Sequence, residues 1–190
     1  MPRPKTVAEL PHLDTEGMQP IRSGQRPELG SALNFIVTAS NSAAMRELVM
    51  ERSDFPLRGD MPAFLLLNQL VYRGAARPTD MADAIQTSRS SVSRIVTRLE
   101  AAGLIMRTPD PNDDRALVIG LTLSGRTVGQ RIVDLGEQIF SSVLDEWSED
   151  ELIFLERLVV KLARSMERAS RHLFSSVSGP SWPLEKVGEK

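Results

Sequence analysis

The sequence contains no cysteine among its 190 residues. That absence excludes disulfide bonds, thiolate nucleophiles and cysteine-ligated metals, and it is typical of proteins of the reducing cytoplasm. Histidine is almost as scarce, because only His12 and His172 occur and neither has a second histidine at metal-ligand spacing. We therefore expect neither a metal nor a cofactor.

Long apolar runs and catalytic motifs are also missing. No stretch approaches the roughly 20 apolar residues that cross a bilayer, and the segment MPRPKTVAELPHLDTEGMQP has no apolar core like that of a signal peptide. No GxSxG, GxGxxG or phosphate-loop pattern occurs, and no nucleophile has a histidine base. These absences predict a cytoplasmic protein that is not an enzyme and does not bind a membrane.

An excess of charge of either sign is absent as well. The chain has 23 basic and 25 acidic residues, which gives a net charge of −2. Global charge therefore does not favour a polyanionic partner, and any face that binds nucleic acid has to be a local basic one.

Proline is concentrated at the two ends. Five of the twelve prolines precede residue 28, and SGPSWPLEKVGEK closes the chain. Such polar, proline-rich sequence buries too little apolar surface to offset the entropy of ordering. We expect a disordered tail over 1–28, a folded region over 29–174 and a flexible tail over 175–190.

The folded region is predicted to be mainly α-helical with a small β-wing. Apolar spacing predicts helices over 31–51, after the N-cap Asp60, in PTDMADAIQ and in TSRSSVSRIVTRLEAAG, which Gly103 closes. LIMRT and ALVIGL are β-compatible runs on either side of PDPNDDR. A hairpin after a helix-turn-helix makes a winged helix. We expect the wing acids Asp110, Asp113 and Asp114 to be solvated rather than to bind a cation.

Two long helices are expected after the wing. Thr122 can cap the first, in which Gly129 and Gly136 either permit close approach of another helix or are simply tolerated. Ser148 and Glu151 form a capping box at the start of the second. Apolar residues cover more of this last helix than one neighbour requires, which favours a homodimer interface over a larger internal core.

The helix in TSRSSVSRIVTRLEAAG has an unusual polar face. On a helical wheel, Val92, Ile95, Val96 and Leu99 share one sector, while Ser90, Arg94 and Thr97 lie opposite with Ser93 and Arg98 beside them. The segment 86–108 holds four arginines and one glutamate, a net charge of +3. Hydroxyls can bond phosphates and arginine can pair with guanine, so this face suits DNA better than a merely solvated surface.

These motifs resemble the MarR family of bacterial winged-helix transcriptional regulators. The likeness covers about 29–169 and is densest in DMADAIQTSRSSVSRIVTRLEAAGLI and DPNDDRALVIGLTLSGR. It implies a homodimer with a DNA-binding lobe over about 60–122 and dimerisation helices over about 29–55 and 123–174. The operator it implies is pseudo-palindromic double-stranded DNA with half-sites about 10 bp apart.

The resemblance also implies the residues that bind DNA. Arg94 is the candidate for base readout, and Arg115 is the candidate on the wing. The full predicted set is Thr87, Ser88, Arg89, Ser90, Ser91, Ser93, Arg94, Thr97, Arg98 and Arg115. Asp114 stands where the family often has arginine, which weakens the wing's positive charge. Gln86 replaces a frequent glycine, which suggests that the turn does not need a positive φ there.

Family resemblance further implies a repressor that a small anionic or aromatic effector releases from DNA. The candidate lining residues are Asn34, Phe35, Arg46, Phe64, Asn68 and Tyr72. The alternative for the aromatic residues among them is that they pack in the hydrophobic core. The alternative function is a winged-helix protein-interaction module whose serine-rich face meets an acidic protein. An effector-binding enzyme would need turnover without a cysteine, a paired histidine or a cofactor loop.

Overall fold

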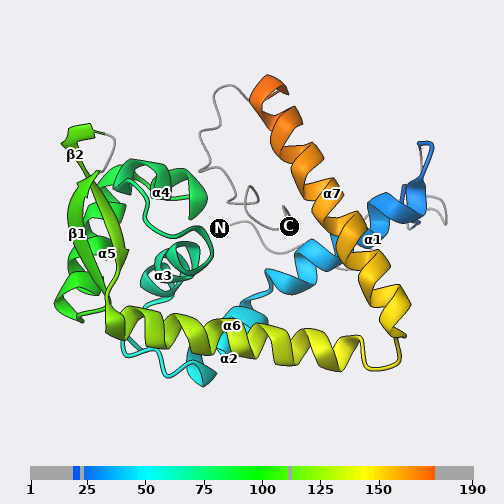
Figure 1. Ribbon diagram of the computed structural model, residues 1–190, viewed down its shortest axis with the longest axis horizontal. Coiled ribbons are helices and arrows are strands. Elements are labelled where there is room, and N and C mark those ends of the chain that lie inside the picture. Colours follow the sequence, from blue (N-terminus) through cyan, green and yellow to red (C-terminus); the bar gives the residue numbers. More distant parts are fainter. Residues whose placement is uncertain (1–18, 22–23, 111–112, 174–190) are drawn as a thin grey trace, which may run out of the picture. The chain divides into compact units, whose positions relative to one another are not determined.

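The computed structural model describes residues 19–21, 24–110 and 113–173. The chain divides into two units, 1–42 and 43–190 (Figure 1). No helix in the described ranges is long and apolar enough to cross a membrane.

The first unit contains one described helix, α1 (Pro27–Ser40). Its large apolar side chains are exposed, namely Leu29, Leu33, Phe35, Ile36 and Val37. The predicted single helix over 31–51 is wrong, because α1 ends at Ser40 and α2 begins only at Ala43. The Asn41 side-chain amide donates to the Val37 carbonyl at 3.0 Å, so polar side chains compete with the helix for its backbone here. The helix also begins two residues inside the predicted tail.

The second unit is a winged helix followed by two long helices. Its elements are α2 (Ala43–Arg52), α3 (Met61–Arg73), α4 (Pro78–Ala84), α5 (Arg89–Ala101), β1 (Ile105–Asp110), β2 (Asp113–Leu121), α6 (Leu123–Val143) and α7 (Glu149–Leu173). This confirms the predicted fold class and the order of its elements from α3 onward.

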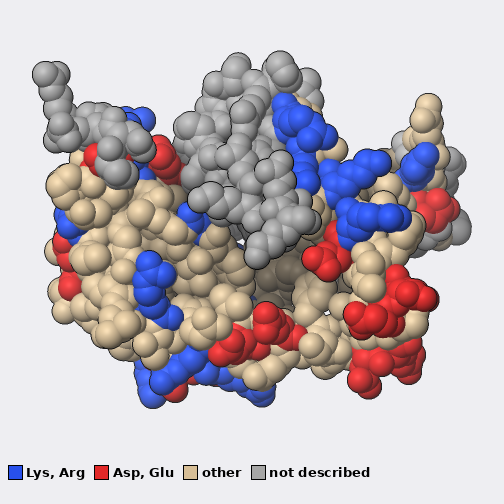
Figure 2. Space-filling model, in the orientation of Figure 1, with Lys and Arg blue, Asp and Glu red and all other residues tan. Residues whose placement is uncertain are grey.

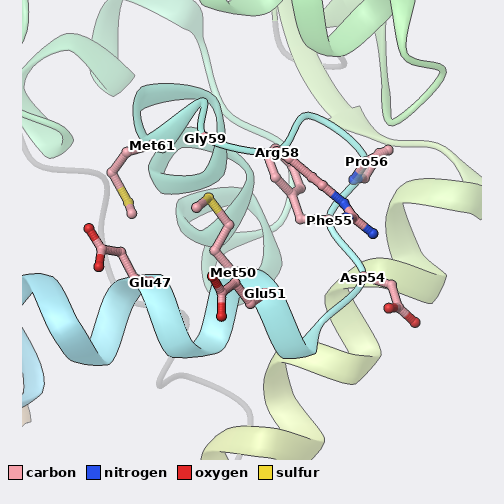
Figure 3. Close-up of a pocket in the computed structure, with 9 residues that line it drawn as sticks. All are labelled: Glu47, Met50, Glu51, Asp54, Phe55, Pro56, Arg58, Gly59 and Met61. Atoms are coloured by element: carbon pink, nitrogen blue, oxygen red, sulfur yellow. The ribbon is translucent and has the colours of Figure 1, made fainter.

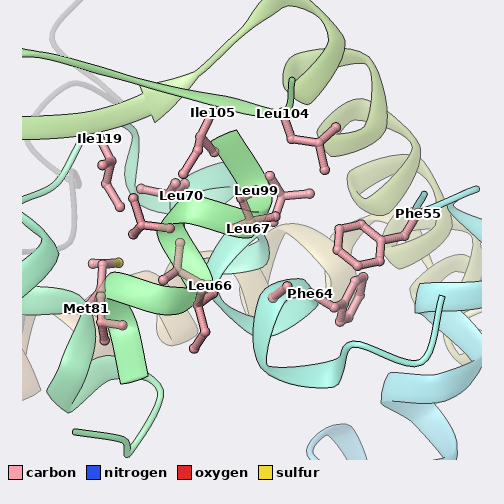
Figure 4. Packing of buried hydrophobic residues seen from close by; sticks show 14 of the residues in the cluster. Phe55, Phe64, Leu66, Leu67, Leu70, Met81, Leu99, Leu104, Ile105 and Ile119 are labelled. Atoms are coloured by element: carbon pink, nitrogen blue, oxygen red, sulfur yellow. The ribbon is translucent and has the colours of Figure 1, made fainter. Parts of the chain in front are cut away.

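Helix α3 lies at the centre of the core. The Asp60 carboxylate caps it by accepting the Ala63 N–H at 3.1 Å, as predicted. Leu66, Leu67 and Leu70 are fully buried. Figure 4 shows them among side chains from α4, α5 and both strands, with Phe55 and Phe64 packed edge to face at one end. This core holds α5 against α3 and so fixes which face of α5 stays outside.

The wing is an antiparallel hairpin in which Ile105 pairs with Leu121 and Thr108 with Val118. Its strands reach further into PDPNDDR than the apolar runs predicted, to Asp110 on one side and from Asp113 on the other. The stretch before α4 joins the sheet edge: Ala76 N–H donates to Ile119 at 3.0 Å, and Ile119 N–H donates back at 2.8 Å. The hairpin is therefore tied to the lobe at its base.

The predicted cap is present on α6, and one of the two hydrogen bonds of the predicted capping box is present before α7. The Thr122 hydroxyl accepts the Gly125 N–H at 3.0 Å at the start of α6. Before α7, the Ser148 N–H donates to Glu151 at 2.8 Å, and the serine hydroxyl donates to the same carboxylate oxygen at 2.7 Å. Figure 2 shows acidic side chains gathered near the turn between these helices, where Asp145, Glu146, Glu149 and Asp150 are exposed.

Candidate nucleic-acid interface

The turn between α4 and α5 has a left-handed residue where glycine is usual. The Thr87 N–H donates to the Ala82 carbonyl at 2.9 Å, across a Gln86 whose φ is 52°. This six-residue bond is the Schellman arrangement that closes many helices, and its C′ residue is normally glycine. The prediction that the turn needs no positive φ is therefore wrong. The geometry is kept, and glutamine adopts it at a cost of roughly 1–2 kcal/mol.

Helix α5 is divided into a buried and an exposed face, as its sequence predicts. Val92, Ile95, Val96 and Leu99 are at most 3% exposed. On the other side, the exposed residues are Arg89, Ser90, Ser93, Arg94, Thr97 and Arg98. Thr87 and Ser91 are half-buried. Nine of the ten predicted DNA-binding residues thus come together on α5 or directly before it.

Several hydroxyls of α5 already serve the helix itself. Ser88 is the N-cap and accepts the Ser91 N–H at 3.2 Å, and its hydroxyl lies 3.0 Å from that of Ser90. The Thr97 hydroxyl donates to the Ser93 carbonyl at 3.1 Å. The Ser88 hydroxyl also donates to that of Ser91 at 2.9 Å, so its two lone pairs accept from the Ser91 N–H and the Ser90 hydroxyl. The serines are therefore explained in part by capping rather than by DNA alone.

The arginines around this face differ in their partners. Arg107 on β1 pairs with Glu100 of α5, with Nε 3.1 Å from Oε2. Arg98 pairs with Asp60. By contrast, Arg89 and Arg94 are exposed and make no hydrogen bond or ion pair with any residue that the structure describes. These two side chains are therefore available to an outside partner.

The Arg98–Asp60 pair was not predicted. Arg98 Nε donates to one oxygen of Asp60 at 2.6 Å and Nη2 donates to the other at 3.0 Å. The hydrogen bond from Arg98 lowers the pKa of Asp60, against the burial that raises it. Sequence reasoning identified Asp60 only as a helix cap, since 38 residues separate it from Arg98. Arg98 itself was predicted to bind DNA.

The wing is held by an ion pair that corrects a prediction. Asp110, expected in a solvated wing tip, is only 7% exposed and accepts from Arg77 Nε at 2.8 Å and Nη2 at 2.7 Å. Arg115 lies on β2, but the side chains of 113–115 fall outside the described part of the chain.

A close junction joins the end of α5 to the start of α6. The Thr122 hydroxyl donates to the Gly103 carbonyl at 2.6 Å, and its N–H donates to the Leu104 carbonyl at 3.1 Å. A Cβ added at Gly125 would overlap that same Leu104 carbonyl oxygen. Of the two alternatives for Gly129 and Gly136, close approach of another helix applies at Gly129, where an added Cβ would lie 2.8 Å from Val71 Cγ2 on α3. At Gly136 an added Cβ would make only ordinary contact, 3.6 Å from the Tyr72 hydroxyl.

The six predicted effector residues are distributed over α1, α2 and α3. Asn34 and Phe35 belong to α1 in the first unit. Phe64 is 2% exposed and packs on Phe55, so it is a core residue. The others are Arg46 on α2 and Asn68 and Tyr72 on α3. Burial, and to a lesser extent Glu137, raises the pKa of Tyr72.

A different hollow lies where α2 runs into α3. It measures about 580 Å³ and none of the six predicted residues lines it. Figure 3 shows Met50 and Phe55 within it and carboxylates at its edge; the lining residues are Glu47, Met50, Glu51, Asp54, Phe55, Pro56, Arg58, Gly59 and Met61. Among the residues that the structure describes, no group of three or more histidines or carboxylates could hold a metal.

A family comparison agrees with this geometry. The model of the MarR family matches residues 60–117, the span from the Asp60 cap through α5 to the wing. This part of the chain is similar to the MarR family. MarR proteins are transcriptional regulators rather than enzymes.

Individual proteins and solved structures are also similar to this chain. The transcriptional repressor MdtR of Bacillus subtilis is 27% identical over 111 residues, which are 58% of this chain and 72% of MdtR. A MarR protein structure from Bacillus stearothermophilus aligns with a TM-score of 0.57 and 23% identity, covering 73% of this chain and 93% of the other. Streptococcus pneumoniae FabT in complex with DNA aligns with a TM-score of 0.54 and 16% identity, covering 76% and 99%. At these identities, the two structures establish the fold.

Proposed function

We propose that this protein is a homodimeric repressor of the MarR family that binds a pseudo-palindromic operator through α5. The observation that carries the proposal is the division of α5. Its apolar face is closed by the core, while Arg89 and Arg94 stand exposed and unpaired among hydroxyls on the other. The nearest acid on the helix, Glu100, is engaged by Arg107.

Arg94 is the residue we assign to base readout, and Arg89 is assigned to the phosphate backbone. Arg94 lies in the middle of the exposed face, where a recognition helix meets the groove floor, and its guanidinium can pair with guanine O6 and N7. Arg89 is the first residue of α5, next to helix N–H groups that also favour phosphate. Apart from Arg98, which pairs with Asp60, the other predicted residues of α5 and Arg115 remain proposed contacts, and the lobe over about 60–122 remains the proposed DNA-binding lobe.

The dimer is proposed from the long helices. Large apolar side chains of α7 are exposed in the single chain, from 41% at Leu162 to 64% at Met166. An exposed apolar stripe of this length on a helix commonly marks a protein interface. A second copy with two-fold symmetry would cover it and would place two α5 helices on one operator. Release by a small effector follows the family and remains part of the proposal.

The test begins with a duplex that the wild-type protein selects from a random DNA pool at about 0.15 M salt. Arg94→Ala should weaken binding to that duplex by about 1–3 kcal/mol and relax specificity at one base position. Arg89→Ala should weaken selected and random duplexes alike and flatten the salt dependence. Arg131→Ala removes the same charge from an exposed position on α6 and is the matched control.

Two results would contradict the proposal. Equal losses on selected and random duplexes after Arg94→Ala would reject base readout by Arg94. Failure of micromolar wild-type dimer to retain any duplex would favour the protein-interaction module.

A further inference from the structure

One carboxylate at the start of α3 holds two helices. Asp60 Oδ1 accepts both the Ala63 N–H at 3.1 Å and Arg98 Nη2 at 3.0 Å, while Oδ2 accepts Arg98 Nε at 2.6 Å. The helix cap and the two hydrogen bonds from the planar guanidinium together fix the orientation of the Asp60 carboxylate. Asp60 therefore links the N-terminus of α3 rigidly to the exposed flank of α5.

The position of Arg98 on α5 gives this link a mechanical consequence. Arg98 follows Arg94 by four residues, which places it about 40° further round the helix, beside the proposed reading face. The buried stripe through Leu99 holds α5 against the core but lies on the far side of the helix from Arg94. The ion pair on the side of α5 restrains rotation of the helix about its own axis. The apolar contacts of the buried stripe are not directional and restrain this rotation less.

The electrostatic consequence points the same way. The Asp60 side chain is 21% exposed and that of Arg98 is 43% exposed, so the pair is partly shielded from water. Asp60 cancels the charge of Arg98 at close range. A DNA phosphate would have to compete with a carboxylate that already takes two of the guanidinium's N–H groups.

From these contacts we infer that Asp60 and Arg98 are a positioning pair for DNA recognition, and that Arg98 does not contact DNA. The pair sets the rotation of α5 and so aims Arg94 into the groove. Asp60 lies outside the helix-turn-helix, at the edge of the lobe, and acts on specificity only through Arg98. The inference rests on the proposed function of α5.

Two substitutions break the pair while keeping the fold. Asp60→Asn retains a capping oxygen for Ala63 but loses the charge, and Arg98→Gln loses the guanidinium. Asp54→Asn is the matched control, because it makes the same change in the same loop, at an exposed residue that pairs with Arg131 of α6 instead. Thermal melting of each variant verifies that it is folded.

The readout is the ratio of affinities for the selected duplex and a random duplex of equal length. A positioning pair predicts that Asp60→Asn and Arg98→Gln each weaken the selected duplex roughly 2–30-fold while random binding and the salt slope stay unchanged. The double variant should lose no more than the stronger single variant. Asp54→Asn should leave the ratio at the wild-type value. A general loss of folded protein would lower both affinities together and leave the ratio unchanged.

The opposite pattern would overturn the inference. If Arg98→Gln weakens both duplexes and flattens the salt slope, while Asp60→Asn strengthens random binding, then Arg98 is a phosphate contact that Asp60 restrains.

Amide hydrogen exchange in the free protein tests the link without DNA. Faster exchange in the second half of α5 with Asp60→Asn, but not with Asp54→Asn, supports the positioning pair. Equal exchange in both variants overturns it. This result stands even if wild-type protein selects no duplex, a failure that would count against the proposed function alone.

Discussion

Helices α5 and α7 are both amphipathic, yet their apolar faces have opposite fates. The four apolar residues of α5 are at most 3% exposed, whereas Ile153, Phe154 and Val159 of α7 are between 52% and 55% exposed. The 13-residue α5 buries its apolar face against other elements of the lobe. The 25-residue α7 does not bury its apolar face within one chain. The comparison distinguishes the apolar face that one protomer buries from the apolar face that we propose a second copy buries.

The largest expected effect tests how closely α5 is held. Gly125→Ala should destabilise the protein by about 4 kcal/mol or more, because the new Cβ would overlap a backbone carbonyl at Leu104, which has no side-chain freedom with which to yield. Urea unfolding followed by circular dichroism measures the loss. Gly136→Ala, where the Cβ meets only the Tyr72 hydroxyl at 3.6 Å, should be neutral or gain up to about 1 kcal/mol of helix propensity. Similar losses in both variants would contradict the close junction.

The second prediction sets the two helices against each other directly. Leu99→Ala in α5 should cost about 2–5 kcal/mol at any protein concentration, because it opens a cavity in a fully buried site. Leu158→Ala in α7 removes a side chain that is 45% exposed, so its cost should appear as weaker dimerisation.

Analytical ultracentrifugation and melting at several concentrations distinguish these two outcomes. Leu158→Ala should lower the melting temperature most at low concentration. A loss that is independent of concentration would place α7 in the protomer's own core.

A smaller effect is expected at the turn that leads into α5. Gln86→Gly should relieve the left-handed strain but add entropy to the unfolded chain, for a net gain of up to about 0.5 kcal/mol. Gln86→Val should lose about 1–2 kcal/mol, because a β-branched residue disfavours positive φ. Gln138→Gly, within α6, is the control and should lose about 1 kcal/mol. A loss with Gln86→Gly would contradict the left-handed geometry.

The smallest effect is a pH dependence. Arg98 lowers the folded-state pKa of Asp60, so the pair's contribution to stability is full above the unfolded pKa of about 3.9 and is lost as pH falls through the lower folded pKa. The stability difference between wild type and Asp60→Asn should therefore shrink as pH falls below about 4. Urea midpoints between pH 2.5 and 7 measure it. Parallel curves over that range would show that Asp60 titrates no differently in the folded state.

The sequence predicted features that depend on local pattern. The caps at Asp60, Thr122 and Ser148 and the two faces of α5 all follow from residue types a few positions apart. The break between α1 and α2 is local too, but apolar spacing outweighed the Ser40-Asn41-Ser42 signal that marks it.

Contacts between distant segments could not be predicted in the same way. Arg77 meets Asp110 across 33 residues and Arg98 meets Asp60 across 38, and nothing in either local pattern names the partner. Arg98 and Arg94 look alike on a helical wheel, and only the fold distinguishes the paired arginine from the available one. The left-handed backbone at Gln86 does not follow from residue type, because a non-glycine residue disfavours positive φ and yet the α4–α5 junction imposes it.

The contacts at Thr122 and Gly125 prevent the end of α5 and the first turn of α6 from moving relative to each other. The two therefore turn as one body, and the direction of α6 reports the direction of α5. A fluorescent label at Thr127, an exposed position one turn into α6, would follow the reorientation of α5 without touching the face that we propose meets DNA.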